Sequence, residues 1–348
     1  MLYRLCCAAL LAALPLGCQY PINDFKQDQQ LEFLQFEAEI SQEYARVLIS
    51  NTSKNLIGNP RVERAVQAEE VYVTDSRGNR TNLPNDGTAL PNFKGVVGET
   101  YVLHARIAGK DYESSPETMR GVPAIDTVGY SFNERSSLTK ANPLKYGFDV
   151  FVRFQDLPES GNYYNWVWTN YSKKFFCSTT RRFGTVYNVP CESGCWEINY
   201  SQDITLFSDE KTNGARQDQP LVRVPFEQPP LQYYLRVEQR AVTPNVYNYL
   251  TSAREQTVST GGQFDVPAQT TFSTNIVCKT DPKEKVLGIF NVFSFDKKII
   301  YIDRDLNLPD KVRIDPDFLR PTCPLPNCVA PCITSRFVTD IEPEGWKE

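Results

Sequence analysis

Ten cysteines and one histidine are the side chains in this 348-residue sequence whose types point most directly to chemistry. Seven of the cysteines lie in the second half of the chain: Cys177, Cys191, Cys195, Cys278, Cys323, Cys328 and Cys332. In an exported protein such cysteines form disulfides, each worth about 2–4 kcal/mol. We therefore expect three bridges and one thiol left over. Spacing does not fix the connectivity, but it groups the first three and the last three cysteines and makes Cys278 a candidate to tie the tail to the body.

A metal site is the alternative use of the same cysteines. Thiolates could come from Cys191-x3-Cys195 together with Cys323, Cys328 and Cys332. The spacings are irregular, however, no histidine lies nearby, and oxidising surroundings disfavour free thiolates. We expect no metal and no cofactor.

Catalytic motifs are absent from the sequence. There is no Gly-x-Ser-x-Gly, no His-Glu-x-x-His and no glycine-rich phosphate loop, and no spacing links the single histidine, His104, to a nucleophile. A surface hydrolase that uses two carboxylates stays open as an alternative, because the chain has 42 acidic residues and such chemistry needs only a pair. We predict a protein that is not an enzyme.

The first thirty residues read as an export and anchoring segment. Residues 1–17 have one early charge and an apolar stretch, which is typical of a signal peptide. Leu-Pro-Leu-Gly before Cys18 resembles a bacterial lipobox, although Pro15 stands where Leu is preferred. Lipidation of Cys18 would anchor the protein, since no later segment has the roughly 20 apolar residues of a membrane span. Residues 18–30 are polar and predict a tether. The alternative is a plain signal peptide with Cys18 in a disulfide.

Charge and aromatic content narrow the partners. The chain has 37 basic and 42 acidic residues and a net charge of −5, which argues against a nucleic-acid partner. The densest aromatic stretch, residues 162–171, offers Tyr163, Tyr164, Trp166 and Trp168 as a ligand or partner surface, because tyrosine and tryptophan are favoured at interfaces. The alternative is a strand packed in the core.

The elements that must hold these residues are mostly strands. From residue 31 the apolar residues alternate with polar ones and turn signals recur, so residues 31–120 predict an antiparallel sandwich with His104 beside Arg106 on its more polar face. Residues 121–322 predict a second β-rich domain. One helix is expected from Thr243-Pro244, with Gly261-Gly262 as its stop. Residues 285–302 read as one buried strand leading into another, and residues 323–348 as a cysteine-rich tail.

Several segments together resemble a known family. They are residues 98–128, 154–166, 246–267 and 286–295, and they occur in the order found in the lipoprotein family of domain of unknown function 4249, which is typical of Bacteroidota. The resemblance implies a first domain similar to prealbumin-like or carboxypeptidase-regulatory sandwiches. It also implies an outer-membrane lipoprotein encoded beside a TonB-dependent transporter, and it carries no catalytic residues.

These observations lead to one expected function and its alternatives. We expect a mainly β protein of two antiparallel, sandwich-like domains, anchored in the outer membrane and facing the cell surface, that serves as an accessory or ligand-capturing subunit of a TonB-dependent uptake complex. The alternatives are a structural subunit of outer-membrane assembly machinery, an adhesin, and the two-carboxylate hydrolase. The ligand is not specified by the sequence.

Overall fold

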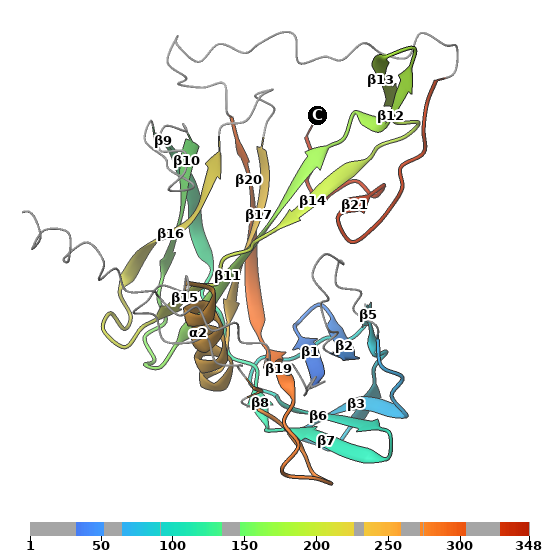
Figure 1. Ribbon diagram of the computed structural model, residues 1–348. Coiled ribbons are helices and arrows are strands. Elements are labelled where there is room, and N and C mark those ends of the chain that lie inside the picture. The colour runs from blue at the N-terminus through green and yellow to red at the C-terminus, as the bar shows by residue number, and fades with distance from the viewer. Residues whose placement is uncertain are drawn as a thin grey trace, which may run out of the picture.

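The computed structural model describes residues 33–51, 65–90, 92–133, 147–225, 233–258, 272–273, 275–303 and 328–347. Within these ranges the protein is mainly β, as predicted, with most strands in antiparallel sheets and one α-helix (Figure 1).

The first domain consists of two sheets packed face to face. One has the order β19-β1-β2-β5 (Leu287–Val292, Leu34–Ile40, Ala45–Asn51, Asp86–Leu90). The other has the order β18-β7-β6-β3-β4, with β8 beside β6 (Ile276–Cys278, Lys110–Ser114, Thr100–Ile107, Glu70–Asp75, Arg80–Asn82; Glu117–Thr118). Both sheets contribute to one hydrophobic core, in which the rings of Phe36 and Tyr112 lie 5.6 Å apart. The period-two pattern of the sequence therefore produces a sandwich.

The second domain is built from two further sheets. One has the order β16-β10-β9 (Arg216–Pro225, Gly147–Gln155, Ile125–Asn133). The other has the order β20-β17-β11-β14-β21, with β15 beside β11 (Ser294–Ile302, Tyr233–Ala241, Tyr163–Lys173, Trp196–Tyr200, Val338–Thr339; Thr205–Ser208). Phe154 of β10 meets Tyr164 of β11 at 5.3 Å between ring centroids. These sheets enclose the second core.

The predicted boundary at residue 120 falls between β8 of the first domain and β9 of the second, but the first domain is not continuous in sequence. We predicted residues 121–322 as the second domain, but residues 276–292 within this range form β18 and β19 of the first domain. The predicted domain bounds are therefore wrong for these residues. β19 joins β1 as a parallel neighbour, and the long connection between them contains the other strands of the first domain as well as most of the second domain. The 285–302 run then continues from β19 into β20, as predicted (Figure 1).

The predicted helix is α2 (Pro244–Val258), and Thr243 begins it. The Thr243 carbonyl accepts from the Tyr247 N–H at 2.9 Å, and its hydroxyl accepts from the Val246 N–H at 3.4 Å. Val246 is buried against Phe293 and Phe295, at the point where β19 passes into β20. The helix therefore packs where the two domains join, and Gly261-Gly262 lies outside the described residues.

A hairpin and the C-terminal segment form a smaller unit at the end of the second domain. We call residues 173–191, which contain β12 (Phe176–Arg182) and β13 (Thr185–Pro190), the finger. The finger extends beyond the sheet that contains β11 and β14, and β21 lies along β14 at the edge of that sheet (Figure 1). The Cys177–Cys191 disulfide closes the base of the finger, and Cys195–Cys332 attaches the C-terminal segment.

Candidate ligand-binding cleft

A cleft of about 380 Å³ lies between the two domains. Its walls come from β1, β2 and β19 of the first domain, and from β11, β17, α2 and residues 201–204 of the second. Clefts between domains are common places for small-molecule sites, because two separate surfaces can present polar groups to one ligand.

Strand β1 supplies one wall through its alternation. Phe36, Ala38 and Ile40 are buried in the first core, so Glu37 and Glu39 lie on the opposite face, toward the cleft. Glu39 is paired in register with Arg46 of β2, and the Glu39 Oε2 to Arg46 Nη2 distance is 3.0 Å. The local pattern of one hairpin thus sets both charge and geometry at this wall.

Arg240 of β17 lines the cleft and connects the two domains. Its Nη2 lies 2.8 Å from Glu238 Oε2, its Nη1 lies 3.4 Å from Glu39 Oε1, and its guanidinium covers the Phe293 ring at 4.4 Å. Burial acts to lower the pKa of Arg240, but the two carboxylates outweigh it and raise the pKa above its ordinary value. Arg240 is therefore a fixed positive charge matched by one glutamate from each domain.

Two tyrosines beside these charges remain protonated. Burial first, and Glu39 second, raise the pKa of Tyr44 well above its ordinary value, and its hydroxyl donates to Glu39 Oε2 at 3.4 Å. Burial and then Glu37 raise the pKa of Tyr249, which lines the cleft from α2. The cleft lining thus includes a protonated phenol from α2 as well as the carboxylates of β1.

Two buried polar atoms at the cleft have no hydrogen-bond partner. They are Asn291 Oδ1 on β19 and Arg46 Nε on β2. A buried acceptor or donor without a partner costs about 1–3 kcal/mol, and such groups in native structures call for an explanation such as an ion, water or ligand. The lining also includes Asn165 and Asp203. These groups suit a polar ligand that both donates and accepts hydrogen bonds.

Gly288 brings β19 close enough to β1 to complete the cleft wall. Its φ is +88°, and a Cβ there would lie 1.9 Å from the Phe36 carbonyl oxygen. Glycine is required here both for the backbone conformation and for the close approach of the two strands. The parallel join that carries Asn291 into the cleft depends on this residue.

The aromatic stretch lies mainly in the core, and its assignment as a ligand surface is wrong for two of the four residues. Tyr164 and Trp166 are 0% and 1% exposed, and Trp166 Nε1 donates to Gln239 Oε1 at 3.0 Å. Trp168 is half-buried against the same core. Tyr163 is half-buried and packs on Tyr247 of α2, with 4.6 Å between ring centroids.

The neighbours of these aromatic residues, rather than the aromatic residues themselves, reach the cleft. Asn165 and Val167 alternate with Tyr164 and Trp166 on β11, so they face the other side of the sheet and line the cleft. The signal that could have identified them is the polar residue at position 165 within an otherwise aromatic run.

The structure pairs Cys177 with Cys191, and Cys195 with Cys332. Cys328 is also disulfide-bonded, while Cys323 lies outside the described residues. The expected link from Cys278 to the tail is wrong: Cys278 is a free, buried thiol in the first core, and Cys195 makes the link instead. Cys278 lies on β18 in the first domain, whereas the C-terminal segment lies along β14 of the second domain. The spacing of cysteines in the sequence does not reveal this separation.

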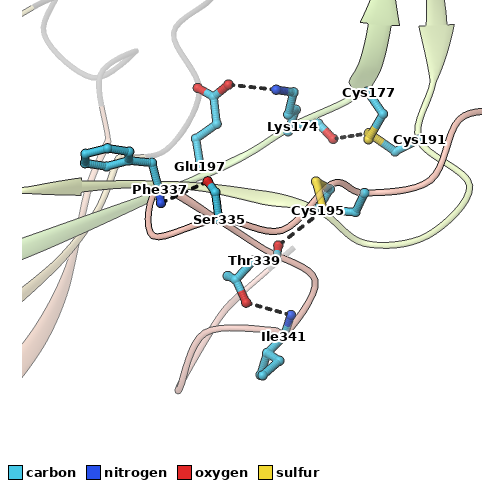
Figure 2. Close-up of a disulfide and its surroundings, with 10 residues drawn as sticks. Lys174, Cys177, Cys191, Cys195, Glu197, Ser335, Phe337, Thr339 and Ile341 are labelled. Carbon is cyan, nitrogen blue, oxygen red and sulfur yellow. Dashed lines mark hydrogen bonds and ion pairs between the residues drawn. A yellow bond between two sulfur atoms is a disulfide. The ribbon is translucent and has the colours of Figure 1, made fainter. Parts of the chain in front are cut away.

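Figure 2 shows the surroundings of Cys195, where β14 meets the C-terminal segment. Lys174 at the base of the finger pairs with Glu197 of β14 at 3.2 Å, next to the Cys177–Cys191 bridge. The sulfurs of Cys177, Cys191 and Cys195 lie within 4.8 Å of one another, which is a metal-like grouping. All three are oxidised in disulfides, so none is a thiolate ligand.

His104 lies on the half-exposed face of β6, as the alternation predicts. Its ring stacks on Tyr72 at 4.7 Å, Nε2 lies 3.0 Å from Thr74 Oγ1, and Nδ1 lies 3.6 Å from Glu113. Burial lowers the pKa of His104, against the opposing effect of Glu113. All of these contacts belong to the first sandwich, and His104 does not line the cleft.

Cys18 and the predicted tether lie outside the described residues, so lipidation stays a prediction. Among the helices of the described ranges, none combines the length and apolar character needed to cross a membrane.

Fold and cleft together define a class: a mainly β, multi-sheet protein with a cleft between two domains that is lined by both polar and apolar side chains. Residues 23–299 match the family model described as domain of unknown function (DUF4249), which is more than half of the chain, so the protein belongs to this family. No curated protein and no solved structure matches the chain.

Proposed function

We propose that this protein is a non-enzymatic, lipid-anchored outer-membrane protein that captures a polar ligand in its interdomain cleft as an accessory subunit of a TonB-dependent uptake complex. The observation that carries the proposal is the cleft itself, where both domains present hydrogen-bonding groups and where Asn291 Oδ1 and Arg46 Nε are buried without partners.

The cleft suits binding better than hydrolysis. A hydrolase of the two-carboxylate type needs one carboxyl free to donate a proton and another free to attack or activate water. Glu39 already accepts from Tyr44, Arg46 and Arg240, so its oxygens are committed to the junction. Asp203 also lines the cleft, and its carboxylate oxygens can accept hydrogen bonds from a ligand, which is what capture requires.

Anchoring at Cys18 would make weak capture sufficient. A tethered module stays at a high effective concentration beside a transporter in the same membrane, so contacts of modest affinity suffice for transfer. Replacement of Cys18 by Ala should abolish labelling with a radiolabelled fatty acid and release the protein from membranes. Continued labelling of the variant would contradict the anchor.

The ligand-binding part of the proposal can be tested with defined probes. The full chain is titrated calorimetrically with oligosaccharides, amino acids and short peptides, and the best binder is repeated with Asp203→Asn and Asn165→Ala. Each variant should weaken binding by about tenfold, which corresponds to about 1.4 kcal/mol for one lost hydrogen bond. Asp126→Asn is the matched control, because Asp126 is exposed outside the cleft. Binding that survives both cleft variants would contradict this site.

The partner is tested separately by purifying the lipidated protein in mild detergent. An outer-membrane TonB-dependent barrel in stoichiometric amount supports the accessory role. Stable recovery with components of an assembly machine, or with no barrel at all, would overturn that role in favour of the structural or adhesive alternatives.

A further inference from the structure

The finger is positively charged, whereas the chain as a whole has a net negative charge. From Ser160 to Cys191 the sequence has four basic residues and no aspartate or glutamate, in a chain whose net charge is −5. Two of the four, Arg181 and Arg182, stand at the tip of β12 and are exposed. No described side chain forms an ion pair or hydrogen bond with either guanidinium. Their charge is therefore not used to hold the fold.

The tip itself presents a single aromatic side chain to solvent. Phe183 is fully exposed, at 103% of its reference area, and its φ of 49° is in the left-handed region. Phe183 and Gly184 form the two-residue turn between Arg182 and Thr185, which are paired in register. Such turns favour Asn-Gly or Gly-Gly, and a bulky residue at positive φ is uncommon. The fold gains no packing from this phenylalanine.

The finger is held as a projecting unit despite having only two strands. An isolated two-stranded hairpin is marginally stable in water. Here the Cys177–Cys191 disulfide closes the base, and Lys174 is paired with Glu197 of the neighbouring strand β14. Residues 178–185 are all exposed, and the hairpin extends past the second domain (Figure 1). The tip can therefore reach a flat surface without rearrangement.

We propose that the finger docks on a membrane surface that carries anionic phosphate headgroups. Guanidinium groups bind phosphate oxygens in a forked geometry, and an aromatic side chain between them can enter the interfacial layer. A specific protein partner fits less well, because such interfaces use about 20–30 residues on each side and the exposed tip is far smaller. The net negative charge of the whole chain means that attraction to an anionic surface must come from a local region such as this one.

The proposal rests on the lipid anchor only for delivery to the membrane, and the test keeps the two apart. The full lipidated chain, with a polarity-sensitive fluorescent amino acid at position 183, is reconstituted on vesicles of phosphatidylcholine alone or of phosphatidylcholine and phosphatidylglycerol in equal parts. On the anionic vesicles we expect a blue-shifted emission that lipid-borne nitroxides quench. On neutral vesicles the label should stay in water.

Charge variants show whether the finger causes the effect. Arg181→Ser with Arg182→Ser should weaken insertion of the tip about 30-fold, since each basic residue near an anionic surface contributes about 1 kcal/mol. Arg77→Ser with Arg80→Ser is the matched control, because these arginines flank another exposed turn but are paired with Asp75 and Glu70. The control should insert like the parent.

The outcomes separate the finger from the anchor. A label that stays water-exposed on anionic vesicles while the protein floats with them overturns the proposal and leaves the finger to a protein partner. Insertion that the control pair reduces as much as the tip pair also overturns it. Failure to float with neutral vesicles would instead contradict the anchor.

Discussion

Arg240 and Arg182 have the same guanidinium group in opposite settings. Arg240 is buried at the domain junction between Glu39 and Glu238 and over the Phe293 ring. Arg182 is exposed on the finger, and no described acidic group meets it. At the junction the charged side chains pair with one another and connect the two domains, whereas the arginines at the finger tip are available to bind a partner.

Two hairpin turns show the same contrast at smaller scale. In the β3–β4 turn the Asp75 carboxylate accepts from the backbone N–H groups of Arg77 and Asn79, and Gly78 takes the left-handed position. In the finger the left-handed positions hold Phe183 and Gly184. The first turn is satisfied by its own residues, while the second exposes a side chain that local folding does not require.

The largest expected effect concerns the two disulfides that hold the finger and the tail. Cys195 and Cys332 are 137 residues apart, and Cys177 and Cys191 are 14 apart. In the chain-entropy description, removing the long bridge with paired serines should lower the free energy of unfolding by about 5 kcal/mol, against about 3 kcal/mol for the short bridge. Denaturant titration of the two double variants measures the difference, and the reverse order would contradict an entropic role.

The junction should be nearly as sensitive to loss of a single charge. Arg240→Ala leaves Glu39 and Glu238 partly buried without their shared cation, so we expect a loss of about 3–5 kcal/mol in the free energy of unfolding. Arg153→Ala is the control, because Arg153 pairs with Asp218 at 2.7 Å on the surface and should cost less than about 1 kcal/mol. Similar losses in both variants would remove the contrast between buried and exposed arginines.

A smaller effect is expected from pH at His104. Because burial lowers the pKa of His104 below 6.5, the unfolded chain takes up this proton first as the pH falls. Stability from this residue is therefore present above pH 6.5 and is lost as the pH falls below it, and His104→Gln should remove that part of the slope. His104 is the only histidine, so its NMR signal is unambiguous. A titration midpoint above 6.5 would contradict the burial effect.

The smallest expected effect is at the finger tip. Arg181→Ser with Arg182→Ser should leave the free energy of unfolding within about 0.5 kcal/mol of the parent, because exposed residues without partners add little to stability. Thermal unfolding at matched pH measures it. A loss of several kcal/mol would mean that the arginines support the fold and would weaken the case that they serve a partner.

Much of the local structure of this protein can be predicted from its sequence. Alternation in β10 buries Phe148, Val150 and Phe154, and Thr243 begins the single described helix, because both patterns depend on residues close together in the chain. The two successive strands within residues 285–302 were predicted for the same reason. The pairing of β19 with the first domain was not predicted, because its parallel partner β1 lies more than 200 residues earlier in the chain.

The cleft could not be predicted for a related reason. Glu37, Asp203 and Asn291 come from three distant parts of the sequence, and each alone is an ordinary polar residue. We predicted the aromatic run as a candidate site, but Tyr164 and Trp166 lie in the core, because burial there removes the most apolar surface from water. Disulfide pairing likewise depends on which strands become neighbours.

Hydrogen–deuterium exchange of the full lipidated chain on anionic and on neutral vesicles tests the separation of roles between finger and junction most directly. The account predicts slower exchange on the anionic vesicles over residues 176–190, with β1, β11 and β17 unchanged. Slower exchange in the cleft strands, or no difference at the finger, would contradict it.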